Sequence, residues 1–305
     1  MRTLMLCSLL WLGALSSLYG ENIVATVNGY DVSQEEFQEW LEKNFLIAFQ
    51  LEVSNKSSLK KHLLKMYCYE KAIWQKLARH NISVNDQEVE KELAKLQKKV
   101  QDIDPLLMER QITQQGFRYR VRMMLAIKKY ISKRVKERDL RQFFQKYKNY
   151  FGGEQIRASH ILIMTMDPKT GKKLDDYQKQ QAYQRILAIK EQILPDGSNF
   201  EKLARQYSDA PSKERGGDVG FFPLRGKMTE AFAKAAFALK RVGAISDIIE
   251  TPYGYHILKI TDYRPPKEVS FAQVKEKVRQ EYIRDKIEEF IQNIRKESVI
   301  EISLD

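Results

Sequence analysis

Two short apolar runs, each carrying one histidine, constrain the fold of this chain more than any other feature. Residues 157–163 read Arg-Ala-Ser-His-Ile-Leu-Ile, and residues 251–259 read Thr-Pro-Tyr-Gly-Tyr-His-Ile-Leu-Lys. Their alternating, β-branched character is typical of buried strands. The chain has only four histidines, so two of them, His160 and His256, are expected to lie inside a sheet.

The stretch that contains the two runs alternates between strand and helix patterns. It begins after Gly152-Gly153 and ends at Pro265-Pro266, a pair typical of a stiff linker. The succession predicts a mixed α/β module of residues 154–265, with helices packed around a small sheet. Its expected elements are strands at 155–164, 245–250 and 255–262 and helices at 175–194, 198–207 and 228–239.

The flanking segments are mainly helical. A capping box of Ser33 and Glu36 opens the first helix, and Gly116 is expected to separate two later ones. A second capping box, Ser270 with Gln273, opens a long amphipathic helix after the module. The other helices before the module are expected at about 57–80, 86–101, 105–115, 117–133 and 137–150. The apolar stripe of the last helix consists of Phe271, Val274, Val278, Ile283, Ile287, Phe290, Ile291 and Ile294.

This stripe has no partner in the module, so the last helix is expected to pack against the helices of residues 33–133. Residues 22–28 and 299–304 alternate like strands and are expected to pair. If two chains exchanged the C-terminal helix and the strand of residues 299–304, the result would be a homodimer. The predicted fold class is therefore α+β: a helical domain of residues 21–153, completed by residues 266–305, with the mixed module inserted.

Residues 1–20 differ from the rest of the chain. A positive start at Arg2 is followed by an apolar run and then by small residues up to Gly20. This order predicts a secretory signal peptide, and the run is shorter than the ~20 residues that span a bilayer. Without this segment one cysteine remains, Cys68, so no internal disulfide can form. We expect an exported protein of the periplasm or cell envelope with no integral membrane segment.

The formal net charge of the chain is +12. Such a charge can attract nucleic acid, anionic lipid or acidic polypeptides. The basic residues are interspersed with Glu and Asp along the helices, as on solvated helix surfaces. Because export also argues against nucleic acid, no nucleic-acid partner is expected.

Residues 207–222 add a third motif. They read Tyr-Ser-Asp-Ala-Pro-Ser-Lys-Glu-Arg-Gly-Gly-Asp-Val-Gly-Phe-Phe. Together with the two histidine runs, in this order and spacing, they resemble the parvulin family of peptidyl-prolyl cis/trans isomerases. The inserted architecture resembles the extracytoplasmic SurA and PrsA class of folding factors. The resemblance implies an isomerase and chaperone that acts on unfolded or newly translocated polypeptides containing proline.

Rotation about an X–Pro bond faces a barrier of ~18–20 kcal/mol because the amide must lose its conjugation. Its catalysis needs an apolar pocket for the ring and polar groups near the carbonyl, and no cofactor or metal. By resemblance, His160 and His256 form a facing pair into which the hydroxyl of Thr251 bonds. By the same resemblance the proline pocket consists of Val219, Met228 and Phe232, with Phe222 as a wall. Ordinary core packing is the alternative reading of this apolar set.

One position departs from the family. Parvulins commonly carry Cys or Asp where this chain has Ala210, which supplies neither charge nor a hydrogen bond. The adjacent Asp209 can take over that role only if the loop shifts by one residue, and we expect it to be catalytic on that basis. Without the shift, activity is reduced and the protein is a holdase with a weak isomerase module. A scaffold or adhesion protein that uses the module as a spacer is a more distant alternative.

Overall fold

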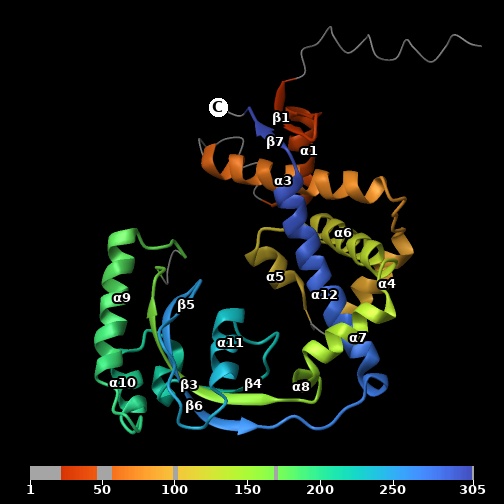
Figure 1. The fold of residues 1–305 in the computed structure, drawn as a ribbon. Helices are drawn as coiled ribbons and strands as arrows, with labels where there is room; N and C mark the ends of the chain where they lie inside the picture. The colour runs from red at the N-terminus through yellow and green to blue at the C-terminus, as the bar shows by residue number, and fades with distance from the viewer. Residues whose placement is uncertain (1–21, 47–56, 99–101, 168–170, 304–305) are drawn as a thin grey trace, which may run out of the picture. The chain divides into compact units, whose positions relative to one another are not determined.

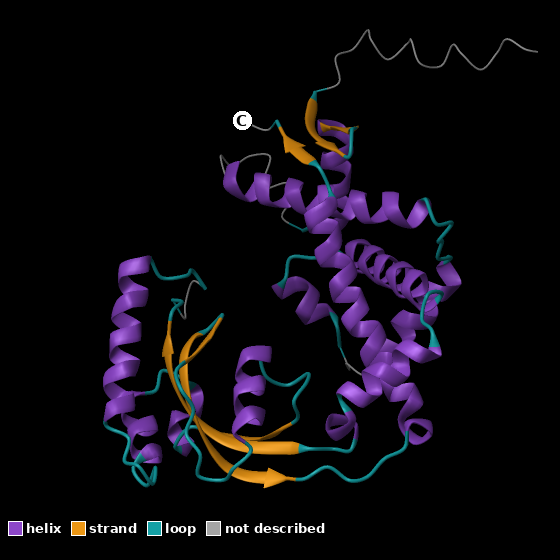
Figure 2. Ribbon diagram, viewed as in Figure 1, coloured by secondary structure: helices purple, strands orange, loops and turns teal. Residues whose placement is uncertain are grey.

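The computed structural model describes residues 22–46, 57–98, 102–167 and 171–303, so the expected signal peptide lies outside the described residues (Figure 1). The chain forms two compact units, one made of Met1–Lys136 with Glu281–Asp305 and the other of Glu137–Gln280. Both units combine helices and strands (Figure 2), which confirms the α+β class. Among the helices so described, none combines the length and apolar character needed to cross a membrane.

The first unit contains a small antiparallel sheet built from both ends of the chain. Its strands are β1 (Ile23–Val27), β2 (Tyr30–Ser33) and β7 (Ile300–Ile302), in the order β2-β1-β7. Beyond the ladder, the Asn28 N–H donates to the Val299 carbonyl over 2.8 Å, and the Asn28 side-chain oxygen accepts from the Val299 N–H over 3.0 Å. The predicted pairing of the two chain ends is thus confirmed.

Helices from both ends pack on this sheet. One core joins the sheet to α1, α3, α6 and α12, and it includes Phe37, Ile283, Phe290 and Ile294. Burial of each such side chain is worth about 1.5–3 kcal/mol. The last three belong to the predicted stripe, so the C-terminal helix does complete the N-terminal domain. The helices of this unit are α1 (Gln34–Asn44), α3 (Ser57–Ala78), α4 (Asp86–Gln97), α5 (Asp104–Glu109), α6 (Gln114–Ser132) and part of α12 (Phe271–Glu297).

Gly116 does not separate two helices as expected. It lies in the first turn of α6, where its N–H donates to the capping hydroxyl of Thr113 over 2.8 Å. A Cβ on this residue would come within 2.5 Å of the Asn44 carbonyl oxygen, so glycine permits the end of α1 to lie against α6. The break falls earlier, where Gln111 has a φ of 55°.

The second unit is built on a four-stranded antiparallel sheet. Its strands are β3 (Gln155–Met164), β4 (Asp218–Phe222), β5 (Ile249–Thr251) and β6 (Gly254–Arg264), in the order β4-β3-β6-β5. The histidine strands β3 and β6 lie side by side at its centre. No strand was expected for the residues of β4. Asp218 and Gly220 disfavour a strand, but the Val and Phe residues of this segment favour one, and pairing with β3 makes it a strand.

Helices cover both faces of this sheet, with α9 and α10 on one face and α11 on the other (Figure 1). The α11 helix begins two residues later than predicted, so Met228 precedes it in a loop. The helices of this unit are α7 (Glu137–Lys146), α8 (Lys148–Phe151), α9 (Asp176–Glu191), α10 (Phe200–Tyr207), α11 (Glu230–Leu239) and the start of α12.

This unit is wider than the expected 154–265 module. The rings of Phe144 and Phe271 lie 5.8 Å apart, and Lys275 pairs with Glu137 over 2.8 Å. Phe271 was predicted to pack on the N-terminal helices together with the rest of the stripe. It packs instead on α7, because the start of α12 belongs to this unit.

Candidate active site

His160 and His256 meet on the face of the sheet that α11 covers. They lie on β3 and β6, whose register pairs His160 with Leu258 and Leu162 with His256, so the histidines are diagonal neighbours. Their rings are stacked, with centroids 5.4 Å apart and an interplanar angle of 16°. The two Nδ1 atoms are 3.2 Å apart, and both side chains are buried. The expected facing pair is therefore present.

The pair is the centre of a chain of hydrogen bonds. Nε2 of His160 lies 2.8 Å from the Ser212 hydroxyl, and Nε2 of His256 lies 2.8 Å from the Thr251 hydroxyl. The Thr251 hydroxyl also lies 3.3 Å from the Gly254 carbonyl, to which it can donate. In that direction His256 donates to Thr251, His160 donates to His256, and Ser212 donates to His160. Every polar group of a neutral pair is then satisfied.

Burial holds this pair neutral. It lowers the pKa of His160 to about 4, and burial together with the neighbouring His160 lowers the pKa of His256 to about 3. Both imidazoles are therefore uncharged at neutral pH. A pair with these pKa values is unsuited to proton transfer with a substrate, and it can instead form a fixed polar floor.

Apolar side chains close the site beside the histidines. The ring of Phe232 lies edge-on to both imidazoles, 5.6 Å from His160 and 5.5 Å from His256. Phe222 lies 5.7 Å behind it and is fully buried, so it supports Phe232 and offers no surface to a ligand. Val219 and Met228 pack on the same cluster and are only partly buried. These two are the members of the predicted pocket with surface to offer a proline ring.

The loop before β4 brings in Ser212, a site residue that the sequence prediction missed. Ser212 lies in a short 3₁₀ helix, Pro211–Arg215. The loop then returns to β3, where the His160 N–H donates to the Gly217 carbonyl over 2.9 Å. Gly217 has a φ of 85°, and a Cβ there would come within 2.3 Å of the His160 carbonyl oxygen. Glycine at this position therefore permits the close approach of the loop to β3.

Asp209 does not join the site as expected. Its Oδ2 accepts the Met164 N–H over 2.9 Å, and its Oδ1 accepts from Arg185 over 3.3 Å. These bonds tie the carboxylate to the end of β3 and to α9, and the predicted one-residue shift of the loop is absent. Ala210 is buried with only its methyl group to offer. The departure predicted at this position is thus present, because Ala210 supplies no polar group to the site.

Phe143 of α7 and Tyr147, which directly follows α7, contact the loop that carries Met228. The guanidinium of Arg225 lies 4.5 Å from the Tyr147 ring centroid and 5.3 Å from that of Phe143. Lys227 closes the loop by donating to the Phe221 carbonyl over 2.6 Å. Such cation–π contacts are worth about 0.5–1 kcal/mol at exposed sites. This contact could not be predicted from the sequence, because Phe143 and Tyr147 have the four-residue spacing of an ordinary helix face.

Comparison with known proteins agrees with this geometry. Residues 160–262 match the PPIC-type PPIase domain, and residues 3–131 match the SurA-like N-terminal domain. Over 284 residues the chain is 31% identical to foldase protein PrsA of Geobacillus kaustophilus, an alignment that covers 92% of this chain and 84% of that protein. The chain belongs to the PrsA foldase family. The predicted parvulin-type isomerase of the SurA and PrsA class is thereby confirmed.

Two further similarities concern the isomerase domain and the longer chain. Over 117 residues the protein is 41% identical to peptidyl-prolyl cis-trans isomerase Pin1 of Arabidopsis thaliana, which covers 35% of this chain and 96% of that one. A crystal structure of PrsA from Bacillus anthracis is 26% identical, with a TM-score of 0.43, and covers 77% of this chain and 96% of that chain. The two family matches, and not these similarities, make this PrsA-family protein a peptidyl-prolyl cis/trans isomerase joined to a SurA-like domain.

Proposed function

We propose that this PrsA-family protein is exported and assists the folding of secreted or envelope proteins in the periplasm or cell envelope. It isomerises X–Pro bonds in newly translocated polypeptides, and its SurA-like domain holds those polypeptides against aggregation. The signal-like pattern of residues 1–20 supports export. The observation that carries the catalytic part is the neutral, fully hydrogen-bonded pair of His160 and His256, closed by Phe232.

The proposed catalysis needs no proton transfer. The proline ring packs on Val219 and Met228, with Phe232 behind them, and this contact excludes water from the amide. A planar amide is more polar than a twisted one because of its resonance. An apolar, water-free surface therefore favours the twisted state over the planar one. The histidine pair keeps the floor of the site rigid, since both rings are fixed by the hydroxyls of Ser212 and Thr251.

A holdase with a weak isomerase module is the second candidate, and Ala210 favours it. The carboxylate next to it, that of Asp209, is held by Met164 and Arg185 and does not replace the missing polar group. In this reading the site binds proline-containing segments and turns them over slowly.

NMR exchange spectroscopy on a short Xaa-Pro peptide separates the two candidates. We expect cis/trans exchange cross-peaks to grow at substoichiometric amounts of the mature protein. Met228→Ala should weaken this acceleration, and Met108→Ala, at an exposed methionine of α5 in the other unit, is the matched control. No acceleration at stoichiometric protein would leave the holdase. The mass of the protein recovered from expressing cells tests export, with a start near Glu21 expected.

A further inference from the structure

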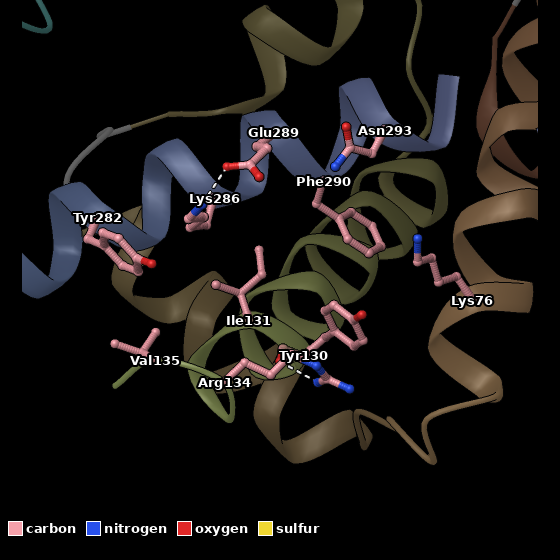
Figure 3. A pocket seen from close by; sticks show the side chains of 10 residues that line it. All are labelled: Lys76, Tyr130, Ile131, Arg134, Val135, Tyr282, Lys286, Glu289, Phe290 and Asn293. Carbon is pink, nitrogen blue, oxygen red and sulfur yellow. Dashed lines mark hydrogen bonds and ion pairs between the residues drawn. The ribbon is translucent and has the colours of Figure 1, made fainter. Parts of the chain in front are cut away.

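The first unit contains a cavity that has no part in the isomerase site. It lies where α3, the C-terminal end of α6 and α12 meet, and its volume is about 240 Å³ (Figure 3). This is smaller than the roughly 300–1,000 Å³ of pockets for drug-sized ligands, so it suits one or two side chains. Its lining consists of Lys76, Tyr130, Ile131, Arg134, Val135, Tyr282, Lys286, Glu289, Phe290 and Asn293.

The floor of the cavity is apolar and firmly packed. Phe290 and Ile131 are 7% and 6% exposed. The Tyr130 ring lies 5.2 Å from the Phe290 ring, and the His80 ring lies 5.1 Å from Tyr130. Because Phe290 and Ile131 belong to the core of the unit and Tyr130 packs against it, the floor is preformed for a large apolar group.

Arg134 lies at the edge of this floor, and no acidic residue in the described part of the chain pairs with it. Its guanidinium lies 3.7 Å from the Tyr130 ring centroid, and Nη1 donates to the Tyr130 carbonyl over 2.8 Å. The other two lining cations are paired, Lys76 with Glu297 over 3.0 Å and Lys286 with Glu289 over 2.6 Å. No carboxylate of the described residues pairs with Arg134. Its remaining N–H groups are therefore oriented and available to an anion.

Asn293 supplies a polar group from the opposite side. It lies on α12 one turn after Phe290, and Figure 3 shows it beside Phe290 and across the cavity from Arg134. The side chain is half-buried, and its amide makes no hydrogen bond with any residue that the structure describes. An amide offers both a donor and an acceptor, which matches a peptide group.

We propose that this cavity binds an Asp or Glu side chain that neighbours a large apolar residue in an unfolded client polypeptide. The carboxylate pairs with Arg134, the apolar side chain lies on Tyr130 and Phe290, and Asn293 bonds to the peptide group between them. Three cations and one carboxylate line the cavity, and the chain as a whole carries +12, so an acidic partner is favoured. This inference rests on the proposed chaperone function and names which client segments it holds.

Calorimetric titration of the full mature chain with N-acetylated, C-amidated peptides tests the proposal. The peptides contain no proline, and they carry a Phe-Asp, Phe-Asn or Ala-Asp pair in one otherwise constant sequence. We expect the Phe-Asp peptide to bind about tenfold more tightly than the Phe-Asn or the Ala-Asp peptide. This factor is the affinity difference expected from one charge-assisted hydrogen bond. Equal binding of Phe-Asp and Phe-Asn would overturn the proposal.

Two variants locate the binding. Arg134→Met should abolish the preference for Asp over Asn, and Asn293→Ala should weaken all three peptides. Arg295→Met, at an exposed arginine of α12 that does not line the cavity, is the matched control. Circular dichroism checks that each variant is folded. A variant at Arg134 that keeps the wild-type preference, or a control that loses it, would contradict the assignment.

An aggregation assay separates this inference from the proposed function. If the protein suppresses aggregation of an unfolded client but shows no Arg134-dependent peptide binding, the cavity assignment is wrong and the chaperone function stands. If peptides bind through Arg134 but the protein suppresses no aggregation, the site stands and the chaperone function is wrong.

Discussion

Replacing Thr251 by valine should destabilise the isomerase unit, whereas the same replacement at Thr261 should not. The Thr251 hydroxyl lies 2.8 Å from Nε2 of His256 and accepts the Tyr253 N–H over 3.2 Å. Valine has almost the same shape and no hydroxyl, so it leaves the buried His256 N–H without a partner. An unsatisfied buried group costs about 1–3 kcal/mol.

Thr261 is the matched control on β6. Its hydroxyl oxygen is buried and, within the described part of the chain, has no hydrogen-bond partner. Removing it relieves the cost of burying an unpaired polar group. We therefore expect Thr261→Val to leave the free energy of unfolding unchanged or to raise it.

Native-state hydrogen exchange on the full chain is the assay, because the amides of β3 and β6 report the stability of this unit alone. A loss of 1–3 kcal/mol corresponds to roughly 5- to 150-fold less protection. Equal protection in wild type and Thr251→Val would refute the hydrogen-bond chain. A loss at Thr261 as large as at Thr251 would show that the effect comes from packing.

Three further predictions follow from the same unit. Both histidines have a pKa below the unfolded value of about 6.5, so the unfolded chain binds more protons than the folded chain between pH 6.5 and 4. The free energy of unfolding is therefore full above pH 6.5 and falls towards pH 4, by about 3 kcal/mol for His160. Equal free energies from urea unfolding at pH 7.5 and 4.5 would contradict this. Phe232→Ala should lower the free energy of unfolding by about 3–5 kcal/mol because its ring is buried. Met228→Ala should instead raise KM with little change in melting temperature. A larger loss of stability for Met228→Ala than for Phe232→Ala would show that Met228 is a core residue. Arg225→Ala should raise KM for an Xaa-Pro peptide with kcat nearly unchanged, and Arg225→Lys should raise KM less. Lys234→Ala, on the exposed side of α11, is the control. If Arg225→Ala lowers only the melting temperature and leaves KM unchanged, the role of Arg225 is structural.

The central strands were predictable because they depend on local pattern, whereas the facing histidine pair was expected from the resemblance to parvulins. The β-branched runs of β3 and β6 indicate buried strands, and an antiparallel register of neighbouring strands brings His160 and His256 to one face. Likewise, the stripe on α12 requires a partner, and Phe290 finds it in the N-terminal core.

The errors have a common physical cause, which is that loops take their structure from distant contacts. Ser212 reaches the site only because the loop approaches β3 at Gly217, and Arg225 is held by an aromatic pair about 80 residues earlier in the chain. Asp209 was assigned from its neighbour Ala210, yet the Met164 N–H decides where its carboxylate points. Periodicity carries no information on any of these contacts.

The pH profile of catalysis shows whether a neutral histidine pair shapes the site without transferring protons. NMR exchange spectroscopy on an Xaa-Pro peptide with the mature protein gives kcat/KM between pH 5.5 and 8. Because the pKa of His160 is about 4 and that of His256 about 3, we expect an acceleration that is constant across this range. A profile that titrates with a pKa between 6 and 7, or no acceleration at any pH, would contradict it.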